Sequence, residues 1–123
     1  MAKLLIVDDE MDIREFAKRF FSKRNINVLT ASDGIEALET VEREKPDMVL
    51  LDITMPRMSG LEVLKRLRAN RNDVDVVMVT GASDEESINE ANSWGIKGYV
   101  HKPLILEELE KKVMSVLRNK GLA

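Results

Sequence analysis

Five polar side chains of the 123-residue sequence stand at the ends of short apolar runs: Asp8, Asp9, Asp52, Thr80 and Lys102. If these runs are neighbouring parallel strands, their carboxyl ends bring the three carboxylates together, with the hydroxyl and the ammonium group on the flank. Three adjacent carboxylates repel one another, and a hard divalent cation relieves that repulsion. The set has no His or Cys ligand to favour zinc or copper. The residue types therefore indicate Mg²⁺, with Mn²⁺ as an alternative, and a phosphoryl group.

Taken singly, most of these residues have a simpler structural explanation. Asp9 could cap a helix, Thr80 could occupy a cap or turn, and Lys102 could be a solvated surface lysine. Asp52 is harder to explain in this way, because it ends a buried strand and has no obvious role in capping a helix. The coincidence of five suitable residues at the ends of four strands favours a joint site.

The elements that must position these residues alternate along the chain. Apolar runs without polar alternation indicate strands buried on both faces. They cover residues 4–7, 48–51, 76–79 and 99–100, and residues 27–31 indicate a fifth strand nearer an edge. Apolar stripes with helical spacing lie between the strands. Their members are Ile13, Phe16, Ala17, Phe20 and Phe21; Ala37, Leu38 and Val41; Val63, Leu64 and Leu67; and Leu106, Leu109, Val113, Val116 and Leu117.

A further helix, from Ser83 to Trp94, has few apolar residues and is predicted to pack loosely. Capping-box spacing at Ser59-x-x-Glu62 and Ser83-x-x-Glu86 predicts two helix starts. Five repeats of strand and helix predict one α/β domain over residues 1–123. Its expected architecture is a doubly wound, flavodoxin-like parallel sheet of five strands in the order 2-1-3-4-5, with helices on both faces.

Composition narrows the function classes. The chain is 44% hydrophobic and 33% charged, which is ordinary for a soluble domain, and its net charge of −3 argues against direct nucleic-acid binding. Two Lys/Arg-rich stretches, 14–24 and 65–71, read as solvated helix faces. The sequence has no cysteine, which excludes disulfides and thiolate sites. The apolar run after Met1 is too short for a signal peptide or a membrane span, so we expect a cytoplasmic protein.

Four segments in order and at matching spacing resemble the response-regulator receiver family over essentially the whole chain. They are Ile6–Glu10, Leu50–Pro56 with Gly60, Val79–Gly81 and Gly98–Pro103. The resemblance is to single-domain members of the chemotaxis-regulator type. It implies a part in two-component signalling, as a phosphoacceptor that catalyses only its own phosphorylation and dephosphorylation rather than as an enzyme acting on other substrates.

The resemblance also implies roles for individual residues. Asp52 would be the phosphoacceptor. Asp9, Asp52 and the backbone carbonyl of Thr54 would ligate Mg²⁺, and Asp8 would act through metal-bound water. Lys102 would pair with a phosphoryl oxygen. These roles agree with the chemistry of phosphoryl transfer, which depends mainly on positioning and on neutralising charge.

Switching is the second implication of the resemblance. Thr80 would hydrogen-bond a phosphoryl oxygen and Tyr99 would swing inward behind it, although Tyr99 could also be a half-buried aromatic that never moves. The bond before Pro103 is expected to be cis. The donor would be a phosphohistidine on a histidine kinase or a histidine phosphotransfer protein. A downstream protein target would read the face formed by the 83–94 helix, the strand at Tyr99 and the last helix.

Some positions depart from the commonest family pattern, and others are open. Leu104 stands where Phe is common, and Ser59 stands where Asp is common. Thr54 and Ala82 are expected to tune water access to the phosphoryl group. Trp94 is either a core residue that closes its helix or an exposed anchor for a partner.

Rival functions fit the sequence less well. A haloacid-dehalogenase-like phosphatase would carry a second Asp at position 54, where this chain has Thr54, and an FMN module would not place three acids after its first strand. No P-loop motif occurs. A pseudo-receiver that acts by protein contact alone stays open, as does the choice between a stand-alone regulator, which the start at Met1 favours, and part of a larger one.

Overall fold

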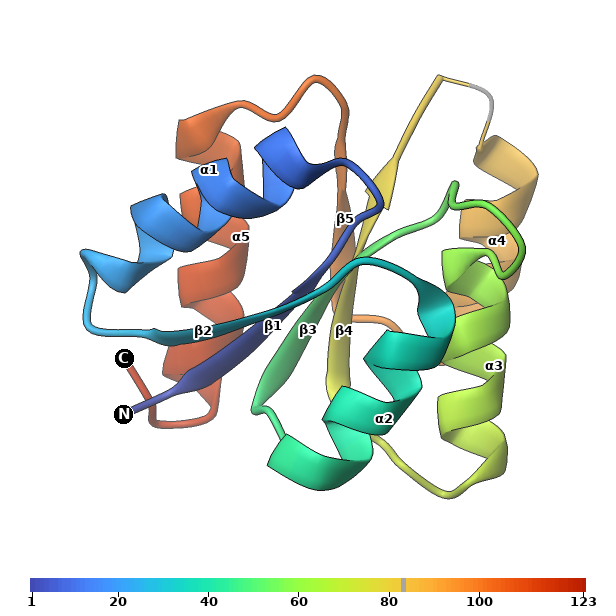
Figure 1. The fold of residues 1–123 in the computed structure, drawn as a ribbon, viewed down its shortest axis with the longest axis horizontal. Coiled ribbons are helices and arrows are strands. Elements are labelled where there is room, and N and C mark those ends of the chain that lie inside the picture. Colours follow the sequence, from blue (N-terminus) through green and yellow to red (C-terminus); the bar gives the residue numbers. More distant parts are fainter. Residues whose placement is uncertain (83) are drawn as a thin grey trace.

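The computed structural model describes residues 1–82 and 84–123. Strands and helices alternate along the whole chain, as the sequence predicts (Figure 1). In chain order they are β1 (Lys3–Val7), α1 (Met11–Ser22), β2 (Asn27–Ala31), α2 (Gly34–Glu44), β3 (Met48–Asp52), α3 (Gly60–Ala69), β4 (Asp75–Thr80), α4 (Glu85–Ser93), β5 (Gly98–His101) and α5 (Leu106–Asn119). Within the described residues, no helix is long and apolar enough to cross a membrane.

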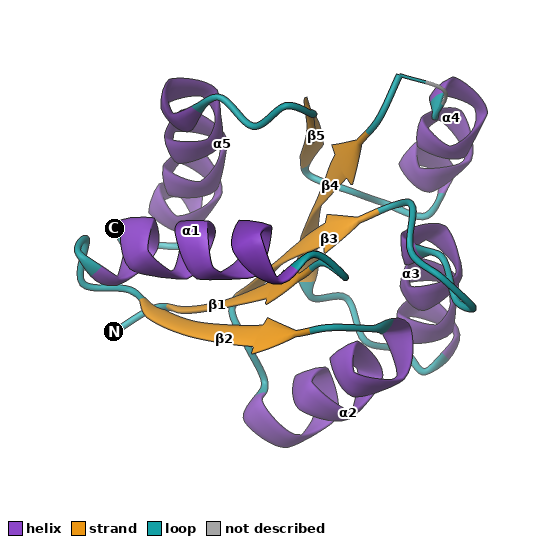
Figure 2. Ribbon diagram, turned by 45° about the horizontal axis from the view of Figure 1, so that its top comes forward, coloured by secondary structure: helices purple, strands orange, loops and turns teal. Residues whose placement is uncertain are grey.

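The five strands form one parallel sheet in the order β2-β1-β3-β4-β5, which confirms the predicted fold. Helices α1 and α5 cover one face of the sheet, and α2, α3 and α4 cover the other (Figure 2). Because β1 and β3 are neighbours, the residues that follow them lie side by side at the carboxyl edge. The register pairs Val7 with Leu51 and Asp52 with Val79.

Two apolar cores explain why the central strands are apolar throughout. Leu5 and Val7 of β1 point into the core under α2, α3 and α4. Leu4 and Ile6 point into the core under α1 and α5. Each of these four side chains is at most 1% exposed. Successive residues of a strand face opposite sides, so a sheet covered on both faces needs apolar residues at every position.

Three residues predicted or offered as core are exposed. Phe16 of α1 is 44% exposed and Leu106 of α5 is 38% exposed, so the predicted buried stripes are wrong at these positions. Phe16 lies at the border of its stripe, away from the buried Ala17 and Phe21, whereas Leu106 is the first residue of α5. Trp94 is 37% exposed. Its explanation as a core residue is wrong, because α4 ends at Ser93 and Trp94 falls beyond the helix face that packs on the sheet.

The basic stretch at residues 65–71 is not simply a solvated face. The Arg68 guanidinium donates hydrogen bonds of 2.7 to 3.0 Å to four backbone carbonyls, those of Asn72, Val74, Trp94 and Gly95. These bonds tie the end of α3 to the end of α4. The prediction for this stretch is therefore wrong at Arg68, whose donors serve the backbone of two loops.

The start of α3 brings its backbone against the end of β3. The Ser59 hydroxyl accepts a hydrogen bond from the Glu62 amide (3.2 Å), so this predicted cap is confirmed. A Cβ atom on Gly60 would lie 2.1 Å from the carbonyl oxygen of Asp52, a distance that only glycine avoids. The second predicted cap falls on Ser83, which lies outside the described residues.

Candidate functional site

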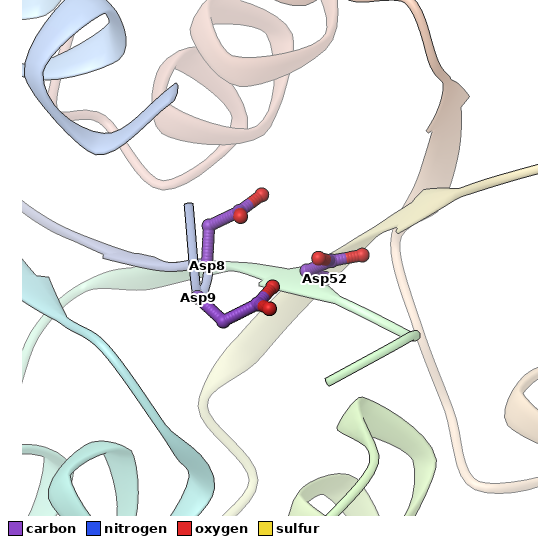
Figure 3. Close-up of side chains that lie close together, drawn as sticks. All are labelled: Asp8, Asp9 and Asp52. Atoms are coloured by element: carbon purple, nitrogen blue, oxygen red, sulfur yellow. The ribbon is translucent and has the colours of Figure 1, made fainter. Parts of the chain in front are cut away.

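Three carboxylates meet at the carboxyl edge of the sheet. Asp8 and Asp9 directly follow β1, and Asp52 is the last residue of β3. One oxygen from each lies within 4.8 Å of the others, and the three side chains extend into one region (Figure 3). Asp8 is 2% exposed and Asp52 is 1% exposed, whereas Asp9 is open to solvent. The site therefore has a buried inner part and one solvated acid at its rim.

Burial dominates the electrostatics of the two inner acids. It raises the pKa of Asp52 to about 6; the hydrogen bond from Lys102 opposes this rise and the charge of Asp8 adds to it. Burial likewise raises the pKa of Asp8, although its carboxylate accepts a hydrogen bond of 2.8 Å from the Glu10 amide. Two acids that resist ionisation at such short range form a site that gains from added positive charge.

Lys102 supplies one such charge. Its Nζ donates to Asp52 Oδ2 at 3.0 Å and lies 3.7 Å from Asp8 Oδ2. Burial lowers the pKa of Lys102, but the hydrogen bond and the charges of the acids outweigh it, so the pKa is raised overall. The simpler explanation of Lys102 as a solvated surface lysine is wrong. The peptide bond between Lys102 and Pro103 is cis.

The Asp9 side chain does not cap α1. The residue at the N-cap position is Glu10, and it makes no side-chain cap hydrogen bond. The backbone after β1 is held in other ways: Asp8 accepts from the Glu10 amide, and Arg14 Nη1 donates to the Asp8 carbonyl at 2.8 Å. The capping explanation for Asp9 is therefore wrong, and its carboxylate belongs to the cluster.

Thr80 ends β4 with its side chain buried at 1% exposure. Its hydroxyl oxygen lies 2.9 Å from His101 Nδ1 and 3.5 Å from the Val100 carbonyl oxygen, both on β5. Among the described residues, the hydrogen bonds of this hydroxyl go to β5 and none goes to the carboxylates. Tyr99 is 41% exposed, and its ring meets the His101 imidazole edge-on at 5.4 Å between centroids. Thr80 thus lies at the same edge of the sheet as the carboxylates, but its hydroxyl is directed to β5.

The loops after β3 and β4 are joined by a residue that the sequence analysis overlooked. The Asp84 carboxylate accepts from the Gly81 amide at 2.6 Å and from the Thr54 hydroxyl at 3.3 Å. The Thr54 amide in turn lies 3.3 Å from Asp52 Oδ1. Asp84 belongs to no motif or periodic pattern in the sequence, so its contacts with two loops carry no sequence signal. Ala82, by contrast, is exposed on the β4–α4 loop.

The donor set of the cluster fits a hard divalent cation. Its three members offer only carboxylate oxygens, which Mg²⁺ prefers, and no imidazole or thiolate belongs to it. Lys102 and a cation could share the negative charge, because Lys102 approaches Asp8 and Asp52 while Asp9 faces solvent.

Comparisons with known proteins show the family of this sequence. A family model described as the response regulator receiver domain matches residues 4–114. The response regulator MprA of Mycobacterium leprae is 37% identical over 116 residues, which are 94% of this chain and 51% of that protein. MprA of Mycobacterium ulcerans is 35% identical over 120 residues. The chain spans about half the length of the curated relatives it matches.

Solved structures extend the likeness to the fold of nearly the whole chain. The chemotaxis protein CheY4 of Vibrio cholerae superposes with a TM-score of 0.87 at 33% identity, covering 95% of this chain and 99% of that one. A response regulator receiver domain protein from Clostridium thermocellum gives a TM-score of 0.89 at 29% identity, covering 99% and 98%. Since the family match runs through nearly all of the sheet and the acidic edge, this chain belongs to the response regulator receiver family of two-component signalling.

Proposed function

We propose that residues 1–123 act as one receiver domain that accepts a phosphoryl group on Asp52. The observation that carries the proposal is the arrangement around this buried carboxylate. Lys102 Nζ lies 3.0 Å from Asp52 Oδ2, and the Asp8 and Asp9 carboxylates lie within 4.8 Å. The donor is a phosphohistidine on a histidine kinase or a histidine phosphotransfer protein, reached in the cytoplasm.

The Asp52 carboxylate acts as the nucleophile. One of its oxygens forms a bond to phosphorus while the phosphorus–nitrogen bond of the donor breaks, and the imidazole leaves with the electron pair and takes up a proton. Lys102, already hydrogen-bonded to this carboxylate, pairs with a phosphoryl oxygen. Water later attacks phosphorus and the phosphorus–oxygen bond to Asp52 breaks, which restores the carboxylate and releases inorganic phosphate. Thr54 and Ala82 line the approach of that water.

The carboxylate cluster holds Mg²⁺, or Mn²⁺ in its place. Asp9, Asp52 and the backbone carbonyl of Thr54 ligate it, and Asp8 contributes through water. When bound, the cation neutralises charge on the equatorial phosphoryl oxygens. The fit of an oxygen-only donor set and the raised pKa of Asp52 to about 6 support this part of the proposal.

Phosphorylation then changes the face formed by α4, β5 and α5. A phosphoryl oxygen accepts a hydrogen bond from Thr80, and Tyr99 turns inward behind it, so that a downstream protein target distinguishes the two states. A hollow of about 420 Å³ beside Thr80, Tyr99 and Ile88 offers room for such a movement. The partners are proteins, and neither nucleic acid nor membrane is bound directly.

Intact mass after incubation with acetyl phosphate and Mg²⁺ tests the acceptor. We expect the protein to gain one phosphoryl group in the presence of Mg²⁺, and we expect no gain with chelator or in the Asp52→Asn variant. An Asp73→Asn variant, which changes an exposed acid away from the site, should behave as the parent. If the folded parent gained no phosphoryl group and bound no beryllofluoride with Mg²⁺, the proposal would be rejected in favour of a contact-only pseudo-receiver.

A further inference from the structure

The one histidine of the sequence lies against the hydroxyl that is proposed to move on phosphorylation. Thr80 and His101 are paired across β4 and β5, at the last position of each strand. Thr80 Oγ1 and His101 Nδ1 are 2.9 Å apart, a good hydrogen-bond distance. This contact joins a buried side chain to a solvent-exposed one, so the imidazole can be reached from outside while it holds the hydroxyl.

Both tautomers of the imidazole hold the hydroxyl at β5. If Nδ1 lacks a proton, it accepts the single hydroxyl hydrogen of Thr80. If Nδ1 carries a proton, it donates to Thr80 Oγ1, and the hydroxyl hydrogen turns to the Val100 carbonyl at 3.5 Å. A phosphoryl oxygen only accepts hydrogen bonds, so Thr80 must give it that same hydrogen. When Nδ1 accepts the hydroxyl hydrogen, this bond and the bond to the phosphoryl group exclude each other. When Nδ1 donates, only the bond to the Val100 carbonyl has to break.

We infer that His101, with Nδ1 accepting the hydroxyl hydrogen, is a positioning residue that competes with the phosphoryl group on Asp52 for the Thr80 hydroxyl, and so sets how readily the switch closes. This inference rests on the proposed function. His101 lies outside the carboxylate cluster and directly precedes Lys102 in the sequence. In the unphosphorylated protein it holds the Thr80 hydroxyl at β5.

The same imidazole also contacts the aromatic side chain of the proposed switch. The rings of Tyr99 and His101 meet edge-on, with 5.4 Å between centroids and 78° between planes. Thr80, Tyr99 and His101 all line the hollow beside α4. When Thr80 moves away, the His101 imidazole loses a hydrogen-bond partner, and the Tyr99 ring packs against this same imidazole. His101 is the physical contact between the hydroxyl and the aromatic ring.

Beryllofluoride binding in the presence of Mg²⁺ measures the competition without a covalent step. The His101→Phe variant keeps an aromatic ring against Tyr99 but cannot hydrogen-bond Thr80. We expect it to bind beryllofluoride about fivefold more tightly than the parent, the change produced by loss of one hydrogen bond from the unbound form. The His101→Asn variant, whose amide can reach the same hydroxyl, should stay near the parent affinity.

A double-mutant cycle shows whether the effect passes through Thr80. In a Thr80→Ala background, His101→Phe should no longer change the affinity. An equal gain in both backgrounds, or no gain in the parent background, would overturn the inference while leaving the acceptor chemistry intact. Absence of Mg²⁺-dependent beryllofluoride binding by the parent would instead overturn the proposed function, and this inference with it.

The unmodified protein gives an independent test, because one histidine makes the imidazole nitrogen signals unambiguous. We expect the ¹⁵N resonance of His101 Nδ1 to shift when beryllofluoride and Mg²⁺ are added, toward its position in the Thr80→Ala variant. A resonance that stays unchanged at saturating beryllofluoride would show that Thr80 does not leave the imidazole, and would refute the inference even if no His101 variant folded.

Discussion

Replacing Asp52 by Asn should stabilise the metal-free protein. The parent carboxylate is 1% exposed and shares its site with Asp8. Burial, together with the neighbouring charge, raises its pKa to about 6 from an ordinary 3.8, against the opposing hydrogen bond from Lys102. The folded state therefore binds this proton more tightly than the unfolded chain does. Asn resembles the protonated acid in shape and stays neutral at every pH.

The size of the effect follows from that difference in proton affinity. A tenfold change in proton affinity, which is one pKa unit, corresponds to about 1.4 kcal/mol. The rise from 3.8 to about 6 therefore means that ionisation of Asp52 lowers the free energy of unfolding by about 3 kcal/mol at pH 8, relative to a neutral side chain. For a domain of this length, that amount raises the melting temperature of the variant by about 10 °C. Because the folded pKa is the higher one, the parent loses stability as pH rises from about 4 to about 7. Below pH 4 the advantage of Asn should vanish.

Urea unfolding in chelator, followed from pH 4 to pH 8, measures the difference between variant and parent. Subtracting the free energy of unfolding of the parent from that of the variant cancels the contributions of all groups that titrate alike in the two proteins. Asp12→Asn, at an exposed position of α1, is the matched control and should show no such growth with pH. A variant that is no more stable than the parent at pH 8, or a difference that is flat with pH, would refute the reasoning from burial and repulsion.

Three further perturbations follow from the same structure. Mg²⁺ at ten times its dissociation constant should raise the free energy of unfolding of the parent by about 1.4 kcal/mol, and by less in Asp52→Asn, as measured by unfolding with and without chelator. Gly60→Ala should destabilise by about 2 kcal/mol or more in urea unfolding, because the new Cβ meets the Asp52 carbonyl at 2.1 Å. Arg68→Met should cost about 2 to 4 kcal/mol through the loss of four hydrogen bonds to carbonyls, whereas Arg66→Met, which loses one exposed ion pair, should change stability by less than about 0.5 kcal/mol.

Each of these has a clear contrary result. Equal melting temperatures with chelator and with millimolar Mg²⁺ would speak against a cation at the carboxylates. A Gly60→Ala protein as stable as the parent would mean that the loop after β3 relaxes freely. Similar losses for the two arginine variants would show that the bonds of Arg68 to the carbonyls carry no special weight.

The layout of the sheet and its acidic edge could be predicted because both depend on local patterns. Uninterrupted apolar runs mark strands covered on both faces, and an acid directly after such a run must lie at the carboxyl edge. Asp8 lies beside Asp52 because β1 and β3 are neighbours in the observed strand order. The start of a helix could also be predicted where the sequence has a capping residue, as it does at Ser59 before α3. The roles of these residues in phosphoryl transfer remain predictions.

Contacts between distant side chains could not be predicted from such patterns. The hydrogen bond of Thr80 to His101 depends on the register of two strands, and the bonds of Asp84 to two loops depend on loop conformation. Helical spacing also predicts too many buried residues, because it does not show how much of the apolar side of a helix is covered by the sheet. Phe16 shows this error on α1, and Trp94 shows its counterpart just beyond the end of α4.

Two of the four hydrogen bonds of Arg68 hold the C-terminal end of α4 to α3 and make the two ends of this helix unequal. The carbonyls of Trp94 and Gly95 are fixed to α3. The residue before the first turn of α4, Asp84, is bonded instead to Gly81 and Thr54 in the loops beside the carboxylates, and not to the helix. A rigid rod held at one end moves as a lever, and nine residues give it a length of about 13 Å. A tilt of this helix would therefore displace its first turn most and Trp94 least. A partner that binds at Trp94 would therefore bind both states of the protein alike, and among contacts to this helix those at its first turn would differ most between the states.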